Sequence, residues 1–192
     1  MEQSLSAPLT IVALGDSLTA GLGLAPAEAF PAQLERFLRS RGIHAEVVNM
    51  GISGATTDGG RNAVGWALEA DPDLVIVELG ANDMLRGMDP DRTEENLRAI
   101  IETFREQNVQ VLLAGMRAPD NLGREYASRF NAVFPRLARE YDLAFYPFFL
   151  EGVAGVEDLN QMDGIHPTAG GIEEIVQRIG PMVADLLQTS ER

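Results

Sequence analysis

The sequence predicts an α/β protein, a single three-layer α/β/α domain built on a five-stranded parallel sheet. Short apolar segments rich in β-branched residues alternate along the chain with longer segments whose apolar residues recur at helical spacing. The short segments are apolar throughout, as expected for strands covered on both faces of a parallel sheet. The 192 residues are enough for one core, and no repeat or linker divides them. We therefore expect residues 1–8 to form an N-terminal tail and residues 9–192 to form the domain.

The expected strands are short and end at small or polar residues. They cover residues 9–14, 43–49, 74–79, 109–115 and 143–146. The third, LVIVEL, is the clearest of them, although it contains Glu78. A buried glutamate needs a partner, so we expect Glu78 to support the neighbouring loops rather than to act in catalysis.

Helices are predicted between these strands and after the last one. Phe30, Leu34, Phe37 and Leu38 are spaced as on one helix face, and that helix stops at Gly42. Further helices are expected over residues 57–70 and 124–141. Asp89 and Pro90 are typical of an N-cap and a first helical residue. Apolar residues at helical spacing over 172–187 predict a terminal helix, kinked at Gly180-Pro181. Strand and helix in alternation favour a flavodoxin-like sheet with the strand order 2-1-3-4-5.

Composition excludes several kinds of chemistry. The chain has no cysteine, and all fifteen basic residues are arginine. Thiol nucleophiles, P-loops, Schiff bases and Ser–Lys dyads are therefore excluded. Only two histidines are present, so a three-histidine zinc site is excluded too. No metal or cofactor is expected.

Charge and hydropathy restrict the partners. The formal net charge of −14 repels phosphate backbones, so nucleic acid is not expected as a partner. No apolar run is long enough to span a bilayer, and no signal peptide is visible, so no stable membrane insertion is expected. Both a cytoplasmic protein and a mature exported protein fit these observations, and the oligomeric state is left open.

Polar residues follow the strands at the edge of the sheet where ligands bind in such folds. Asp163 and His166 lie three residues apart in a turn, with Gly164 between them. A carboxylate so placed can hold the imidazole Nδ1–H while Nε2 faces a nucleophile. A turn in which Asp163 merely accepts from backbone amides is the alternative, and the spacing alone favours it.

Ser17 follows the first strand, where a serine is often only an N-cap. A nucleophile there would gain from the amides at the start of a helix. Asn82 follows the third strand as a turn former or as a donor to the same oxyanion. Gly54 follows the second strand and either supplies a positive φ or lets its N–H approach a substrate. Each signal is weak alone, and their order along the chain is what favours a serine hydrolase.

Two other interpretations compete. Gly51-Ile52-Ser53-Gly54-Ala55 approaches the G-x-S-x-G elbow of α/β-hydrolases, with Ser53 as nucleophile, but the last glycine is missing. A non-catalytic flavodoxin-like module, such as a receiver with Asp16 in its acidic cluster, lacks the lysine that receivers use. A dinucleotide fingerprint beginning at Gly21 is rejected because Pro26 stands where the third glycine belongs.

Four sequence blocks resemble the SGNH (GDSL-type) hydrolase superfamily. They are Gly15-Asp16-Ser17-Leu18, Asn49-Met50-Gly51-Ile52-Ser53-Gly54, Gly80-Ala81-Asn82-Asp83 and Asp163-Gly164-Ile165-His166-Pro167. The resemblance implies a serine esterase for carboxylic esters, thioesters or lysophospholipids, with a triad of Ser17, Asp163 and His166. It implies an oxyanion hole formed by the Ser17 and Gly54 N–H groups and the Asn82 side chain. The likeness is greatest to small bacterial thioesterases, lysophospholipases and arylesterases, many of which are exported, so it favours a periplasmic or secreted location.

Apolar residues in the same loops are candidates for contact with the acyl group of a small ester substrate. The candidates for substrate binding are Leu18, Leu22, Met84, Met116, Arg117 and Ile165. Leu24, Leu85, Met88 and Leu122 belong to the same apolar loops. The methionines would adapt to several chain lengths. Core packing is the alternative for most of the apolar residues, and a surface salt bridge is the alternative for Arg117.

Overall fold

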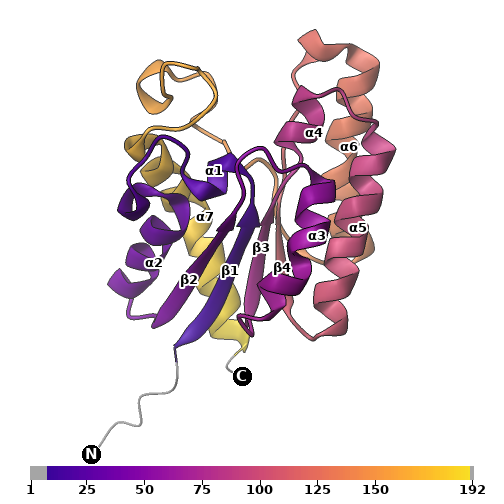
Figure 1. The fold of residues 1–192 in the computed structure, drawn as a ribbon. Helices are drawn as coiled ribbons and strands as arrows, with labels where there is room; N and C mark the ends of the chain where they lie inside the picture. Colours follow the sequence, from indigo (N-terminus) through magenta and orange to yellow (C-terminus); the bar gives the residue numbers. More distant parts are fainter. Residues whose placement is uncertain (1–7, 191–192) are drawn as a thin grey trace, which may run out of the picture.

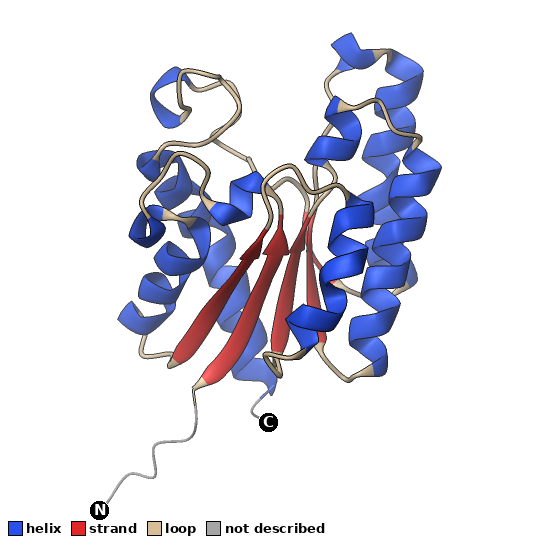
Figure 2. Ribbon diagram, viewed as in Figure 1, coloured by secondary structure: helices blue, strands red, loops and turns tan. Residues whose placement is uncertain are grey.

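The structure, a computed structural model, describes residues 8–190, so the predicted tail lies outside the described residues except for Pro8. Five parallel strands form one sheet in the order β2-β1-β3-β4-β5 (Figures 1 and 2). Their bounds are β1 Leu9–Gly15, β2 Ala45–Gly51, β3 Leu74–Glu78, β4 Gln110–Ala114 and β5 Ala144–Tyr146. The predicted fold class and strand order are confirmed.

Helices cover both faces of the sheet. Helix α2 (Phe30–Ser40) packs against α7 (Ala169–Ser190) in one layer. On the opposite face, α3 (Thr57–Leu68) packs against α5 (Pro90–Glu106), and α5 packs against α6 (Arg124–Glu140). Figure 1 shows α7 behind the strands and α3 in front of them. This sandwich explains the uniformly apolar strands, because β1 and β3 have buried side chains on both faces.

Two short helices start where strands end; a helix start is expected at Ser17, but neither helix has predicted bounds. Helix α1 (Ser17–Ala20) follows β1, and α4 (Ala81–Leu85) follows β3. At four and five residues they are too short to give a periodic signal in the sequence. Short 3₁₀ turns occupy Pro26–Glu28, Asp120–Leu122 and Glu157–Leu159.

The predicted strands, and the helices predicted over 57–70 and 124–141, have observed boundaries within two residues of the predicted ones. Strand β2 shows the largest shift, because it begins at Ala45 and runs to Gly51, two residues later than predicted at each end. Helix α7 continues through Pro181 as one helix, and the predicted kink there stays a prediction. The expected start of α5 is confirmed, because Asp89 caps it through the Asp91 N–H and Pro90 is its first residue.

Buried apolar side chains from both helix layers and the sheet form one core. The largest fully buried side chains include Phe30, Phe104, Phe130, Phe134 and Phe149. Among the described residues, no helix is both long enough and apolar enough to cross a bilayer.

Candidate active site

The nucleophile candidate Ser17 is the first residue of α1, directly after β1. The residue before it, Asp16, caps the helix, since its Oδ1 accepts the Leu18 N–H at 2.9 Å. The N-cap role that serine often has at such a junction is therefore taken by Asp16. The Ser17 hydroxyl is left to bond elsewhere.

The hydroxyl of Ser17 lies beside the imidazole of His166, although 149 residues separate them in sequence. The distance between Ser17 Oγ and His166 Nε2 is 2.9 Å. The other ring nitrogen, Nδ1, is 2.5 Å from Asp163 Oδ2. Ser17 is 9 % exposed, so its hydroxyl is shielded from most of the solvent. The structure thus brings together three of the residues predicted from sequence, in the order nucleophile, base and orienting carboxylate.

A tight hairpin orients His166. Its strands are joined by an antiparallel bridge between Asn160 and Pro167, and the Gln161 N–H donates to the His166 carbonyl at 2.7 Å. Gly164 turns the chain with φ of +69°, a conformation that favours glycine. Asp163 therefore acts on both the backbone and the ring, because its Oδ1 also accepts the N–H groups of Ile165 and His166.

The bonds to Asp163 keep its carboxylate ionised. The bond from the His166 side chain, together with the His166 and Ile165 backbone N–H groups, lowers the pKa of Asp163 to about 2. The turn interpretation and the catalytic interpretation of Asp163 are therefore compatible, since one oxygen serves each.

Two amides at the site have no acceptor. Neither the Ser17 N–H nor the Gly54 N–H donates to any group in the described part of the chain. Gly54 has φ of +82°, and its carbonyl is held by Arg86 Nη2 at 2.8 Å. Ser17 and Gly54 both line the same cavity. Two unbonded donors beside a serine hydroxyl are suited to receive an oxyanion.

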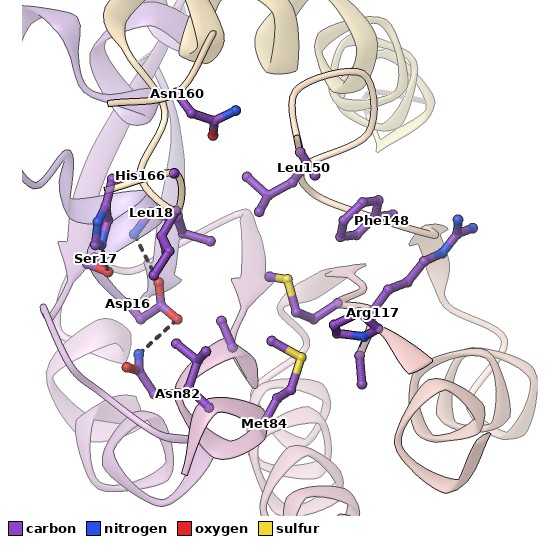
Figure 3. A pocket seen from close by; sticks show the side chains of 18 of the residues that line it. Asp16, Ser17, Leu18, Asn82, Met84, Arg117, Phe148, Leu150, Asn160 and His166 are labelled. Carbon is purple, nitrogen blue, oxygen red and sulfur yellow. Dashed lines mark hydrogen bonds between the residues drawn. The ribbon is translucent and has the colours of Figure 1, made fainter. Parts of the chain in front are cut away.

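The Asn82 side chain also lines this cavity, but its amide is already bonded. Its Nδ2 donates to the Ala55 carbonyl at 2.9 Å and to Asp16 Oδ2 at 3.2 Å, as Figure 3 shows for Asp16. The contact with Asp16 is the longer of the two. An oxyanion at this position would either share the Nδ2 hydrogen of Asn82 with Asp16 or replace Asp16 as its acceptor.

A buried polar cluster fixes the helix that carries Asn82. The next residue, Asp83, accepts from the Thr57 N–H at 2.8 Å, the Thr57 hydroxyl at 2.5 Å and the Thr93 hydroxyl at 3.1 Å. Asp83, Thr57 and Thr93 are fully buried. Donors from α3 and α5 thus satisfy the carboxylate and anchor the start of α4.

Two buried carboxyls lie beneath the nucleophile. Burial raises the pKa of Asp16 to about 6, although the Leu18 N–H, His166 and Asn82 each favour the ionised form. Burial, and then the charge of Asp16, raises the pKa of Glu78 well above its usual range. Glu78 Oε2 accepts from the Thr19 hydroxyl at 2.7 Å, and Oε1 has no partner among the described residues. Glu78 therefore supports α1, as predicted.

The site opens into an apolar cavity of about 700 Å³. All six residues predicted to contact substrate line it, namely Leu18, Leu22, Met84, Met116, Arg117 and Ile165. Leu85 lines it as well, whereas Leu24, Met88 and Leu122 are not among the lining residues. Figure 3 shows Ser17, His166 and Asn82 on one side of the cavity and Arg117 on the opposite side, with Met84 between them at the bottom of the view. Arg117 also lies over the Phe148 ring and 3.9 Å from Glu151, so its predicted salt bridge is present too.

Several lining residues were missed by sequence reasoning. Phe148, Leu150 and Asn160 come from the long segment after β5, whose course follows from no periodic pattern. Asn131 on α6 also lines the cavity. Its side chain bonds both the N–H and the carbonyl of Ala118. No role of its own was predicted for Asp16 within the block Gly15-Asp16-Ser17-Leu18. A charged residue directly after a buried strand was the available signal for it.

The alternative nucleophile Ser53 is exposed in the turn after β2. Within residues 8–190 it makes no hydrogen bond to His166 or Asp163. His44 is exposed, as predicted. No group of three or more potential metal ligands gathers in the described part of the chain.

Comparison with known proteins identifies the family of the chain. Residues 13–173 match the model of the GDSL-like Lipase/Acylhydrolase family. The chain belongs to this family. As a GDSL-like acylhydrolase it is a serine hydrolase of carboxylic esters, and neither the Ser53 elbow nor the non-catalytic module is favoured.

Individual relatives cover most of the acylhydrolase chain. It is 38 % identical to Esterase TesA of Pseudomonas aeruginosa over 183 residues, which are 95 % of this chain and 91 % of the relative. It is 42 % identical to Thioesterase 1/protease 1/lysophospholipase L1 of Escherichia coli over 159 residues, 82 % of this chain and 75 % of the relative. The crystal structure of AlinE4, an SGNH-hydrolase family esterase, superimposes with a TM-score of 0.80 at 46 % identity, covering 96 % of this chain and 99 % of that one.

Proposed function

We propose that this acylhydrolase cleaves esters through an acyl-enzyme on Ser17, with His166 as general base and Asp163 as its orienting carboxylate. The 2.9 Å contact between Ser17 Oγ and His166 Nε2 carries the proposal. A base within hydrogen-bonding distance of the hydroxyl is the requirement for activating serine at neutral pH.

The reaction begins when His166 Nε2 takes the hydroxyl proton and Ser17 Oγ attacks the acyl carbon. Asp163 stabilises the imidazolium that forms, and it remains ionised because its pKa is about 2. The carbonyl oxygen becomes an oxyanion facing the N–H groups of Ser17 and Gly54, with Asn82 Nδ2 as the third donor. His166 then protonates the leaving alcohol or thiol. Water, activated by the same imidazole, releases the acid from Ser17.

The acyl part of the substrate occupies the apolar cavity. Met84, Met116 and Leu150 line it with flexible aliphatic side chains, which suits acyl chains of several lengths. We therefore propose small acyl esters as substrates, with thioesters and lysophospholipids as further members of the class. The relatives' names, which include thioesterase and lysophospholipase, support this range.

Reaction with a fluorophosphonate tests the nucleophile. Wild type and Ser53→Ala are expected to be labelled on the peptide that contains Ser17, and Ser17→Ala is expected to be neither labelled nor active on p-nitrophenyl butyrate. Full activity in Ser17→Ala, or label on Ser53, would refute the proposal.

A series of p-nitrophenyl esters from acetate to palmitate tests the acyl site. Met84→Trp narrows the cavity, so the variant is expected to lose activity on the longer esters and to keep activity on acetate. Equal losses on every ester would show that the cavity does not bind the acyl chain.

The proposal includes a location outside the cytoplasm. Resemblance alone supports this location, and fractionating the source cells tests it.

A further inference from the structure

The Ser17–His166 pair joins two loops that lie far apart in sequence, so something must hold those loops together. Ser17 is the first residue of α1, which leads into the nucleophile loop (residues 21–25). His166 lies in the hairpin of residues 160–167. The hydroxyl–imidazole bond itself is broken and remade in every catalytic cycle. It is therefore the wrong bond to rely on for alignment.

Gln161 bridges the two loops with its side chain. Its Nε2 donates to the Leu22 carbonyl at 2.8 Å and to the Pro167 carbonyl at 2.9 Å. One bond thus reaches the loop that follows the nucleophile, and the other closes the hairpin beside His166. Both hydrogens of the amide are used.

These bonds belong to a continuous chain between the backbones of the catalytic pair. The Leu22 N–H donates to the Ser17 carbonyl at 3.1 Å, the Leu22 carbonyl accepts from Gln161 Nε2, and the Gln161 N–H donates to the His166 carbonyl at 2.7 Å. The Ser17 Oγ–His166 Nε2 contact closes the ring. Only two residues, Leu22 and Gln161, stand between the two backbones.

A glycine in the nucleophile loop leaves room for the Gln161 side chain. Gly23 has φ of +81°, and a Cβ there would lie 2.3 Å from Gln161 Oε1. Any larger residue at position 23 would push the glutamine away from the Leu22 carbonyl.

We propose, on the basis of the function proposed above, that Gln161 is a positioning residue that sets the distance between Ser17 and His166. It does not touch the reacting atoms and is not itself among the residues that line the cavity, and its contact with the lining residue Leu22 is to the backbone carbonyl. Its loss should therefore lower kcat and leave KM nearly unchanged, because the acyl site is intact while the proton transfer is misaligned.

Gln33 provides a matched control. Its Nε2 also donates to two carbonyls, those of Glu28 and Ala169, both at 2.9 Å, and it also ties distant parts of the chain together. One bond reaches Glu28 at the end of the turn Pro26–Glu28, the other reaches Ala169 at the start of α7, and neither reaches the Leu22 carbonyl. Replacing either glutamine by methionine removes two N–H donors, keeps a side chain of similar length and adds no charge.

The experiment compares Gln161→Met with Gln33→Met in kcat, KM, rate of fluorophosphonate labelling and thermal midpoint. Both variants should lose similar stability, since each loses two side-chain-to-carbonyl bonds. Only Gln161→Met should lose kcat and labelling rate, by about tenfold to a hundredfold for a displacement approaching 1 Å. Its KM should stay within about twofold, as expected when only transition-state interactions are lost.

Three results would overturn the inference. These are a kcat for Gln161→Met close to wild type, an equal kcat loss in Gln33→Met, or a rise in KM that accounts for the whole effect. If Gln161→Met does not fold, Gln161→Asn replaces it, since its amide is one methylene too short to reach both carbonyls. Activity in Ser17→Ala would instead refute the proposed nucleophile, so the two failures are distinguishable.

Discussion

Asp16 Oδ2 lies 3.2 Å from Asn82 Nδ2, so the residue before the nucleophile contacts the proposed oxyanion donor. The same carboxylate caps α1 through its other oxygen. One buried side chain thus connects the loop after β1 with the loop after β3.

Asp16→Asn is expected to lower kcat by about tenfold, because an amide cannot accept from both the Leu18 N–H and Asn82 Nδ2. The pKa of Asp16 is about 6, so wild type loses this acceptor as the pH falls through 6. The acid limb of kcat/KM should therefore be shallower in Asp16→Asn than in wild type. Asp185→Asn, on the exposed side of α7, is the control, and identical acid limbs would contradict the role assigned to Asp16.

Asn82→Ala is expected to reduce kcat by roughly 10²–10³-fold, the usual cost of removing one oxyanion donor. Steady-state kinetics on p-nitrophenyl butyrate measure the loss. Asn131→Ala removes an amide from the cavity wall that donates only to the Ala118 carbonyl, so it should affect KM more than kcat. Unchanged turnover in Asn82→Ala would remove this residue from the mechanism.

Asp163→Asn is expected to reduce kcat by about 10³–10⁴-fold, because the imidazole loses its carboxylate. In wild type, bonds from His166 and Ile165 hold the pKa of Asp163 at about 2, so this carboxyl stays ionised from pH 4 to 9. General-base catalysis by a neutral imidazole requires activity to rise from acid toward neutral pH. A maximum near pH 4 would exclude His166 as the base, and Asp158→Asn in the neighbouring loop should behave as wild type.

Glu78→Gln is expected to stabilise the protein at alkaline pH. The folded-state pKa of Glu78 is raised above its unfolded value, so its contribution to the free energy of unfolding is largest below about pH 4.5 and falls as the pH rises. Glutamine does not titrate and can still accept from the Thr19 hydroxyl. The difference in thermal midpoint between variant and wild type should therefore grow from pH 5 to pH 9. Parallel curves would show that the pKa of Glu78 is not raised in the folded protein, and Glu46→Gln on exposed β2 should give such curves.

The fold was predictable because its signals are local. Continuous apolar runs such as LVIVEL identify buried parallel strands, and Asp89-Pro90 marks a helix start whose capping bond the structure contains. The extents of helices α1 and α4 could not be predicted, because four or five residues show no periodicity. The two-residue shift of β2 reflects the weak burial pattern of that edge strand, which is exposed at Glu46 and Asn49.

The site was partly predictable for a different reason. Parallel strands end at one edge, so residues that directly follow β1, β2 and β3 must lie close together. The cavity wall depends instead on the segment from Phe148 to Asn160 and on Asn131 in the middle of α6. The engagement of Asn82 by Asp16 and Ala55 depends on side-chain geometry. Neither the cavity wall nor the hydrogen bonds of Asn82 can be predicted from composition or residue spacing.

Because the hydroxyl follows β1 and the imidazole lies in the hairpin after β5, the reactive centre is assembled only after the last strand of the sheet has been synthesised. A nascent chain that has emerged only as far as β5 holds the nucleophile and the amide donors but no base. Esterase activity therefore reports that the C-terminal part of the domain has docked, and so does the rate of phosphonate labelling at Ser17. Either measurement can be used to follow the kinetics of refolding.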